Sequence, residues 1–531
     1  MKPFDLTNEK YHMGHFFMDS VRRKPDAINQ IDAATGVSET NTSVLHRSVQ
    51  LARCLRRFGC KPGDVLALGG RNHLDLHIPF YAALMNGMPI AGVDPQFKYT
   101  EIKAHFKVCS PRIAFCQEDY IEDHIRVIKE LALDTKLLCF DDGEYSMKRF
   151  IEEYDDNVDD KDFEPLDFDL DNVYAWLIST GGTTGVLKLA AFKHRTFMFK
   201  VSEMIKIFSQ NKQEKTNGEL ELTLHLSPVQ WVSGFFNAIC LPFMQHGKLI
   251  TSAPATIEHV IDIINKYKPV TTMGGPALIS SLLRSDKECD FSCFTSVAIA
   301  GSKVHKDLIV ELRKRLRPEA KVLEVYGQTE NLGAILVPNP DGPLGNCGKI
   351  VYGCHKIKIM DPETGTEITQ PNTSGELWTK GACFSGYYKN LEETVKVFTD
   401  DGWYRTGDIF HFDEEGNFYF VERLKMLIKY RNYHIVPPEL EAVIREHPGV
   451  EDVSVTSIPN EQDGDHPVAC VVRRNDSNVT AQEIKDLVAS TLSDSQKLRG
   501  GVVFMDQIPL TSTGKVARGK LQQMVLTAHR E

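Results

Sequence analysis

Apolar side chains recur at helical spacing in the first part of the chain. Residues 44–58 carry apolar side chains three to four positions apart, which predicts a helix, and the segment 76–86 predicts another. The mostly apolar run 63–70 between them predicts a strand. The same order returns further on, where a predicted strand at 173–180 precedes a predicted helix at 194–208. Alternating strands and helices favour parallel sheets covered by helices.

The pattern changes near residue 422. Two aromatic-rich runs within 410–421 flank the turn residues 413–417 and predict a β-hairpin, which a polar segment follows. A chain of 531 residues is too long for one hydrophobic core, so two or more domains are expected. We therefore expect a boundary at this point, between a domain at 1–421 and a domain at 422–531.

The second domain is predicted to be a small α+β unit. A helix is expected to begin after Pro437-Pro438 and to end near Pro448. Strands are predicted at 450–458 and 467–473, and a last strand leads into a loop. Thr480 lies three residues before a glutamate, the capping-box pattern that starts another helix.

Composition and charge narrow the class of protein. The net charge of -11 argues against general binding of nucleic acids, which needs a basic surface. No apolar run approaches the roughly 20 residues of a membrane-spanning helix, and the first residues lack the apolar core of a secretory signal. The last residues are not the Ser-Lys-Leu peroxisomal signal, so a cytoplasmic location is expected, with the peroxisome left open. The 12 cysteines are scattered, as expected for reduced thiols.

The segment 179–188 has the composition of a phosphate-binding loop. It reads Ser-Thr-Gly-Gly-Thr-Thr-Gly-Val-Leu-Lys and follows a predicted strand, where α/β folds bind ligands. Small residues let the backbone turn tightly, so that N–H groups and hydroxyls can donate to phosphate oxygens, and Lys188 adds a cation. A plain turn rich in glycine and threonine explains the loop as well. A Walker-type loop is disfavoured, because Val186 and Leu187 separate the glycine from the lysine.

Five ordered motifs resemble the adenylate-forming superfamily, which includes acyl-CoA synthetases, 4-coumarate:CoA ligases and insect luciferases. They are the loop at 179–188, Tyr326-Gly-Gln-Thr-Glu330, Gly402-Trp-Tyr-Arg-Thr-Gly-Asp408, Arg423-Leu-Lys-Met-Leu-Ile-Lys429 and Thr513-Gly-Lys515. Their order and spacing agree with the superfamily over most of the chain. The segment 497–504 is most similar to the insect luciferase-like branch.

The resemblance implies an α/β fold. A large N-terminal domain of mixed, mainly parallel sheets flanked by helices would hold the ATP and acyl sites, and a small mobile α+β C-terminal domain would act as a lid that rotates about Glu422-Arg423. It further implies an acid–thiol ligase that uses ATP and Mg2+ to convert a fatty or aromatic carboxylic acid to acyl-AMP and pyrophosphate. The acyl group would then pass to coenzyme A, so the expected partners are small molecules.

By the same resemblance, ATP is bound by two of the motifs in the first domain. The phosphate loop contributes Thr180, Gly181, Gly182, Thr183, Thr184, Gly185 and Lys188. Tyr326 would lie against the adenine beside Gly327, and Thr329 would bond the α-phosphate. Glu330 would bind Mg2+, which prefers carboxylate and phosphate oxygens. On local sequence alone, Tyr326 is equally well a core aromatic residue at the end of a strand.

The remaining motifs contribute charged groups. The resemblance implies that Asp408 accepts hydrogen bonds from both ribose hydroxyls and that Arg423 assists at the ribose and phosphate. Lys515 would bridge the substrate carboxylate and the α-phosphate, where a cation offsets the charge on a pentacoordinate phosphorus. Lys429 is placed with the catalytic residues, and Asn432 beside the pantetheine arm of CoA. Without the resemblance, Asp408 is a turn aspartate and Lys515 an exposed loop lysine.

The acyl pocket is predicted from two short segments. Trp231 stands where the superfamily often has an aromatic gate, although a buried core tryptophan explains it equally well. Ala300, Gly301 and Ser302 match a wall of small residues that leaves room for the acyl chain. Lys303 replaces a common proline, and its direction is not predicted.

The chain departs from the superfamily pattern at several positions. Gly181 stands where a hydroxyl residue is usual, and Leu187-Lys188-Leu189 stands where Pro-Lys-Gly is usual. Asn432 replaces a glycine that lets the backbone approach CoA. Asparagine is the next best residue at positive φ, but its side chain would narrow the CoA path.

Two further functions stay open. One is an adenylating enzyme with another acceptor, as in a luciferase-like monooxygenase or an amide-forming enzyme. The other is a catalytically dead nucleotide-binding homologue. The charged residues of all five motifs are present together, which counts against the dead homologue, whereas the altered phosphate loop counts for it.

Overall fold

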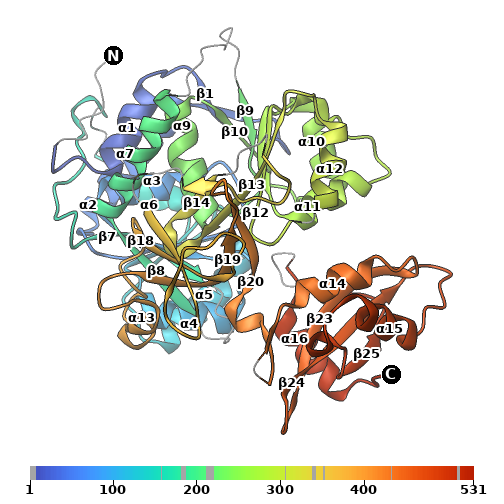
Figure 1. Cartoon of the computed structure of the whole chain (residues 1–531). Coiled ribbons are helices and arrows are strands. Elements are labelled where there is room, and N and C mark those ends of the chain that lie inside the picture. Colours follow the sequence, from blue (N-terminus) through green and yellow to red (C-terminus); the bar gives the residue numbers. More distant parts are fainter. Residues whose placement is uncertain are drawn as a thin grey trace. The chain divides into compact units, whose positions relative to one another are not determined.

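The computed structural model describes residues 8–531 apart from 157, 159, 181–186, 211–220, 305, 338–341, 351, 352, 354, 432 and 511–514. The chain forms two compact units (Figure 1). Unit 1 comprises Met1–Gly345, Lys349–Lys356 and Thr379–Tyr404, and unit 2 comprises Asn346–Gly348, Ile357–Trp378 and Arg405–Glu531. The boundary expected at residue 422 stays a prediction.

Unit 1 contains a six-stranded sheet in the order β6-β5-β3-β4-β7-β8. Its strands are β3 Leu66–Gly69, β4 Ile90–Val93, β5 Ile113–Cys116, β6 Lys136–Cys139, β7 Tyr174–Thr180 and β8 Lys188–Lys193. All neighbours are parallel except β7 and β8. The predicted strands at 63–70 and 173–180 are confirmed. Strand β8 was not predicted, because its four central residues are all buried and show no polar alternation.

Helices cover both faces of this sheet. They are α1 Met13–Arg22, α2 Asn41–Arg57, α3 His77–Met85, α4 Tyr99–Cys109, α5 Ile121–Glu130, α6 Met147–Tyr154 and α7 His194–Gln210. Successive strand side chains point to opposite faces: Leu66 and Leu68 pack with α1, α2 and α3, whereas Ala67 packs with α4. The helices predicted at 44–58, 76–86 and 194–208 are confirmed as α2, α3 and α7.

A nine-stranded sheet, also in unit 1, has the order β15-β14-β13-β12-β11-β9-β10-β1-β2. Its strands are β1 Ile28–Asp32, β2 Ser38–Thr40, β9 Leu222–Leu224, β10 Gly247–Ile250, β11 Thr271–Gly274, β12 Ser296–Ala300, β13 Lys321–Gln328, β14 Gly333–Val337 and β15 Lys349–Ile350. Its middle strands are parallel, and β2, β14 and β15 are antiparallel to their neighbours. The expected mixed, mainly parallel architecture is thus confirmed.

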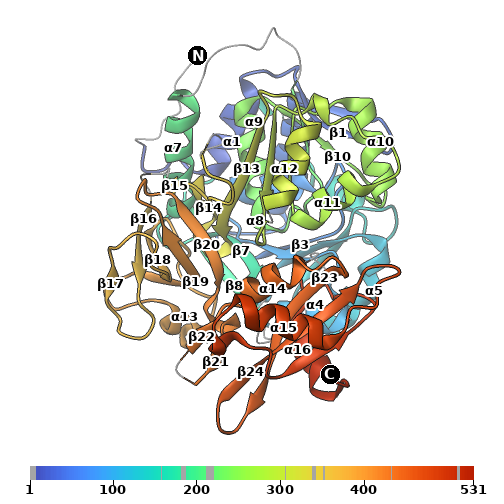
Figure 2. The same ribbon diagram turned by 45° about the vertical axis from the view of Figure 1, so that its right-hand side comes forward.

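Three helices, α10 Ile257–Tyr267, α11 Pro276–Arg284 and α12 Lys306–Arg315, lie together beside this sheet (Figure 2). Their apolar side chains share one core with strands β1, β9, β10, β12 and β13. Short helices α8 Val232–Phe235 and α9 Leu241–Met244 flank a π-helix at Phe236–Cys240. The helix α13 Leu391–Val397 also belongs to unit 1.

A five-stranded sheet follows, in the order β17-β16-β18-β19-β20. Its strands are β16 His355–Met360, β17 Glu367–Ile368, β18 Gly375–Gly381, β19 Tyr404–Phe412 and β20 Phe418–Arg423. The hairpin predicted at 410–421 is confirmed as β19 and β20. The carboxylate of Asp413 closes its turn by accepting hydrogen bonds from the N–H groups of Glu415 (3.0 Å) and Asn417 (2.8 Å).

The last part of unit 2 is the α+β unit expected from the sequence. Its elements are β21 Ile428–Tyr430, β22 Tyr433–Ile435, α14 Pro437–Arg445, β23 Val450–Asn460, β24 Gly464–Arg473, α15 Ala481–Thr491, β25 Gly501–Phe504 and α16 Arg518–Thr527. The capping box is confirmed, because Thr480 and Glu483 exchange hydrogen bonds of 3.3 and 2.8 Å at the start of α15. Helices α14 and α15 share one apolar core with strands β21 to β25.

Two structural findings bear on the class of protein. Within the part of the chain that the structure describes, no helix combines the length and the apolar character needed to cross a bilayer. The 11 cysteines described there carry free thiols. The cytoplasmic location stays a prediction.

Seven histidines are buried among the described residues, and burial lowers the pKa of four of them to about 3 or 4. His12, His105, His225 and His355 are at most 4% exposed. Burial lowers the pKa of His12, His225 and His355 to about 3 and that of His105 to about 4. At His225 the ammonium of the buried Lys248 lowers the pKa further. Each imidazole therefore stays neutral well below the pH at which a free histidine is protonated.

We predict that mild acid destabilises the protein. An unfolded histidine binds a proton near pH 6.5, whereas these four stay neutral until about pH 3 or 4. The unfolded state binds more protons in this window, so the free energy of unfolding falls as the pH falls through it. Urea titrations at pH 7 and pH 5 should show this loss, and His225→Asn should reduce it by about 2 kcal/mol. The exposed His529→Asn is the control, and an unchanged loss in His225→Asn would contradict the prediction.

Candidate active site

The proposed phosphate loop connects two antiparallel strands. Thr180 at the end of β7 pairs with Lys188 at the start of β8, so the loop closes a hairpin rather than leading into a helix. Gly181, Gly182, Thr183, Thr184 and Gly185 lie outside the described residues. The position of Lys188 is therefore fixed by the sheet on one side of the loop.

The other edge of β8 binds a distant segment of the chain, 385–388. Ala191 accepts a hydrogen bond from the N–H of Ser385 (2.8 Å) and donates one to the carbonyl of Gly386 (3.0 Å). The N–H of Tyr388 donates to the carbonyl of Leu189 (2.8 Å). These bonds bring the start of α13 to the side of Lys188.

Four side chains then meet at the start of β8, and we call them the Lys188 cluster: Lys188, Glu330, Tyr387 and Glu393. The ammonium of Lys188 forms an ion pair with Glu393 and lies 5.0 Å from the ring centroid of Tyr387. The hydroxyl of Tyr387 donates to Oε1 of Glu330 (3.1 Å). Hydrogen bonding from Lys188, with help from Lys396, lowers the pKa of Glu393 to about 2. The structure thus brings together two residues that the sequence assigned to phosphate and Mg2+, Lys188 and Glu330.

The β13–β14 hairpin positions the Tyr326 motif. Tyr326 is 9% exposed near the end of β13, and Thr329 and Glu330 follow in a 3-10 helix at Thr329–Asn331. A side-chain carbon at Gly327 would lie 2.2 Å from the carbonyl oxygen of Gly333. Only glycine lets the two strands approach this closely, so the motif needs Gly327 for packing whatever it binds.

The two segments assigned to the acyl pocket border the same hairpin. The indole N–H of Trp231 donates to Oδ2 of Asp94 (2.7 Å), which fixes the ring at the start of α8. The next residue, Val232, lies beside the start of β14, since a side-chain carbon added at Gly333 would lie 3.8 Å from its Cγ2. Ala300 ends β12 and pairs with β13, and Gly301 follows with φ of +97°. Ser302 is exposed beyond it.

Glu324 is a residue that the sequence analysis missed. It lies on β13 two positions before Tyr326, so both side chains point to the same face of the strand. Burial raises the pKa of Glu324 to about 7, although Lys303 and the N–H of Val304 oppose the shift. The only signal in the sequence was a lone carboxylate inside an otherwise apolar strand. Lys303, whose direction was left open, therefore acts on Glu324.

In unit 2, Asp408 and Arg423 face each other across the β19–β20 pair. Arg423 Nε lies 3.5 Å from Oδ1 of Asp408, which is 3% exposed. Lys515 is exposed, yet the pKa of its ammonium is lowered: desolvation is the largest cause, Arg423 lowers it further and Asp408 opposes both. The structure therefore pairs Asp408 with Arg423 and places Lys515 within electrostatic range of both.

The turn that carries Asp408 is held by residues the sequence analysis did not single out. Gly407 has φ of +69°, which favours glycine, and its N–H donates to Oε1 of Glu376 (2.9 Å). The same Glu376 carboxylate accepts a hydrogen bond from Trp378 (2.7 Å). The hydroxyl of Thr406 donates to the carbonyl of Leu377 (2.6 Å). No motif in the sequence pointed to this support.

The remaining predicted residues lie elsewhere in unit 2. Lys429 is exposed on β21 and pairs in register with His434 on β22. Asn432 lies outside the described residues, and its neighbour Arg431 has φ of +52°. A two-residue hairpin loop needs positive φ at its centre, which explains the backbone of Arg431.

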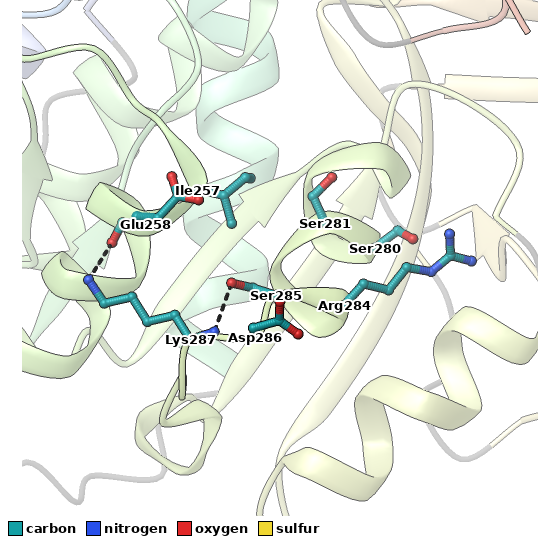
Figure 3. A pocket seen from close by; sticks show the side chains of 8 residues that line it. All are labelled: Ile257, Glu258, Ser280, Ser281, Arg284, Ser285, Asp286 and Lys287. Atoms are coloured by element: carbon teal, nitrogen blue, oxygen red, sulfur yellow. Dashed lines mark hydrogen bonds between the residues drawn. The ribbon is translucent and has the colours of Figure 1, made fainter. Parts of the chain in front are cut away.

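A hollow of about 550 Å3 lies on unit 1 beside α10 and α11 (Figure 3). Its lining is polar and includes Ser280, Ser281 and Arg284 from α11. It contains none of the motif residues. We therefore do not assign it to the nucleotide or the acid.

Comparisons with known proteins agree with the motifs. A family model described as AMP-binding enzyme matches residues 17–388, and one described as AMP-binding enzyme C-terminal domain matches residues 439–515. Luciferin 4-monooxygenase of Photuris pensylvanica is 32% identical over 492 residues, covering 90% of this chain and 88% of that protein. 4-Coumarate–CoA ligase-like 1 of Arabidopsis thaliana is 26% identical over 536 residues, covering 98% of this chain and 96% of that protein. The ATP-bound structure of MatB from Rhodopseudomonas palustris has a TM-score of 0.85 at 21% identity, covering 97% of this chain and 99% of that chain.

The fold is that of the adenylate-forming enzymes, with mixed sheets flanked by helices and a small C-terminal domain. The first family model spans more than half of the chain. The chain belongs to the AMP-binding enzyme family.

We predict that Gly327→Ala destabilises unit 1. The added carbon meets backbone at 2.2 Å, so the β13–β14 hairpin must shift, at a cost of about 1–3 kcal/mol. The matched control is Gly275→Ala, whose added carbon would lie 3.9 Å from the nearest oxygen, that of Ala300. Urea unfolding of both variants gives the comparison. Equal stability of the two would show that the hairpin tolerates a side chain at this position.

Proposed function

We propose that this protein is an ATP-dependent acid–CoA ligase. It would convert a fatty or aromatic carboxylic acid to acyl-AMP with release of pyrophosphate, and then to acyl-CoA. Family membership supports the adenylation step, and the curated relative described as a CoA ligase-like protein supports the acceptor.

The observation that carries the proposal is the Asp408–Arg423 ion pair in unit 2, with Lys515 within electrostatic range of both residues. Adenylation joins two anions, so its barrier is largely electrostatic. An ammonium at Lys515 suits the developing charge on the α-phosphate. The buried carboxylate of Asp408 suits the two ribose hydroxyls, because one carboxylate has two acceptor oxygens.

The Lys188 cluster supports the phosphate assignment in unit 1. Glu330 fits an Mg2+ ion that is also bound by substrate phosphates, since such ions use one or two carboxylates. The described residues contain no group of three or more side chains that could hold a metal by themselves, which agrees with that mode. When bound, the ion would neutralise charge on the phosphates. Tyr387 would orient the Glu330 carboxylate through its hydroxyl.

A second function has a specific observation in its favour. The 32% identical relative is described as a monooxygenase, so an adenylating enzyme with oxygen as acceptor is the main alternative. An amide-forming enzyme and a catalytically dead homologue are the others. Thr329, Trp231, Ala300, Gly301 and Ser302 keep their assigned roles in each adenylating alternative.

Two assays separate these functions. Exchange of labelled pyrophosphate into ATP, run against panels of fatty, aromatic and short acids, detects adenylation and names the acid. Thioester formation after addition of CoA then tests the acceptor. Exchange without thioester formation would favour the monooxygenase or the amide-forming enzyme, and no exchange with any acid would favour the dead homologue.

We predict that Lys515→Ala separates the two half-reactions. Loss of a transition-state cation should slow formation of acyl-AMP by about 100-fold or more. Thioester formation from supplied acyl-AMP should change little, because that step forms no bond at the α-phosphate. Single-turnover assays of each half-reaction give both rates. The exposed Lys520→Ala is the control, and equal slowing of both halves in Lys515→Ala would contradict the assignment.

A further inference from the structure

Glu393 is shared between two lysines. Its carboxylate forms ion pairs with Lys188 and, through Oε1, with Lys396 (2.6 Å). The side chains of Lys188 and Glu393 are 14% and 27% exposed, so water and salt screen this pair less than an ordinary surface pair. The backbone of Glu393 is fixed as well, because its N–H donates to the Asn390 side chain that caps α13 (3.1 Å).

The partners of Lys188 define what its ammonium faces. The ring of Tyr387 lies against this ammonium, and its hydroxyl donates a hydrogen bond to Glu330, the residue assigned to Mg2+. Glu393 therefore places a negative charge in the place where a phosphate of ATP would contact Lys188. Two anions cannot share one ammonium at close range without repulsion.

We propose that Glu393 competes with the phosphates of ATP for Lys188, and that nucleotide binding transfers Glu393 to Lys396. The inference rests on the proposed function, because it takes Lys188 as a phosphate ligand. Lys396 already contacts the same carboxylate, so Glu393 keeps a cation when Lys188 leaves it. Glu393 thus sets the affinity for nucleotide and leaves the chemistry of the reacting atoms to other residues.

The chain offers a matched control next to Glu393. Glu392 has the same side chain, lies in the same first turn of α13 and pairs with the same Lys396 (2.8 Å). It is 82% exposed, and its ion pair is with Lys396 rather than with Lys188. Removing either charge changes the net charge of α13 equally, so any difference between the two variants comes from Lys188.

Calorimetry of the full chain with ATP, pyrophosphate and adenosine tests the proposal. Glu393→Gln should lower the Kd for ATP and for pyrophosphate about three- to tenfold, because no carboxylate has to be displaced. Lys396→Met should raise both Kd values about two- to fivefold, because Glu393 then has Lys188 as its main partner. Glu392→Gln should stay within about twofold of the wild type. Adenosine has no phosphate and should bind all four proteins equally.

Several results would overturn the proposal. Unchanged ATP affinity in Glu393→Gln would show that the ion pair does not compete, and weaker binding would show that Glu393 holds Lys188 in place for the phosphates. A tighter adenosine complex would show a general change of the site. If the wild-type protein binds no ATP, the proposed function is wrong and the competition with ATP cannot occur. In that case labelling of the Lys188 amine by an acylating reagent, read by mass spectrometry, still tests the pair: it should rise in Glu393→Gln and not in Glu392→Gln.

Discussion

The hydrogen bonds on both edges of β8 are the constraint on which the site in unit 1 depends. One edge pairs with β7 and the other binds segment 385–388. Lys188 and Glu393 are 205 positions apart in the chain and meet because Lys188 lies on this strand and the segment that leads into α13 is hydrogen-bonded to it. Gly386 makes the second anchor possible: its φ is +126°, and a side-chain carbon there would lie 2.6 Å from Thr394 of α13. Thr394 in turn accepts a hydrogen bond from the N–H of Tyr387 (2.9 Å), so the turn and the helix hold each other.

In both units, a lysine assigned to the substrate lies near a carboxylate. The chain has a net charge of -11, so an anionic substrate needs cations at chosen points rather than a basic surface. Lys188 and Lys515 both lie near a carboxylate, Glu393 and Asp408 respectively. A partly desolvated ammonium without such a neighbour would be costly to fold. The carboxylate that stabilises each lysine in the unbound protein is therefore also a group that the substrate must displace or bind beside.

Much of the fold followed from apolar spacing, and the exceptions have physical causes. The amphipathic helices α2 and α7 were predictable because one face of each is apolar. Strand β8 was not, since burial on both faces removes the polar alternation that marks a strand. The motif residues could be named from the resemblance, but Glu393, Tyr387 and Glu376 act through contacts with residues remote in sequence. Glu324 shows the same limit, because its raised pKa comes from burial that no local pattern reveals.

The predicted hinge at Glu422-Arg423 is restrained by a hydrogen bond and by ion pairs. Glu422 is 7% exposed; its Oε1 accepts a hydrogen bond from the N–H of Arg423 (2.8 Å), and its Oε2 lies 3.4 Å from Nη2 of Arg518. Arg518 also pairs with Glu441 (2.9 Å) and begins the helix that follows the Lys515 loop. Breaking one carboxylate from a largely buried guanidinium leaves charge poorly compensated. Any rotation about Glu422 must therefore carry Arg518 along or break this ion pair.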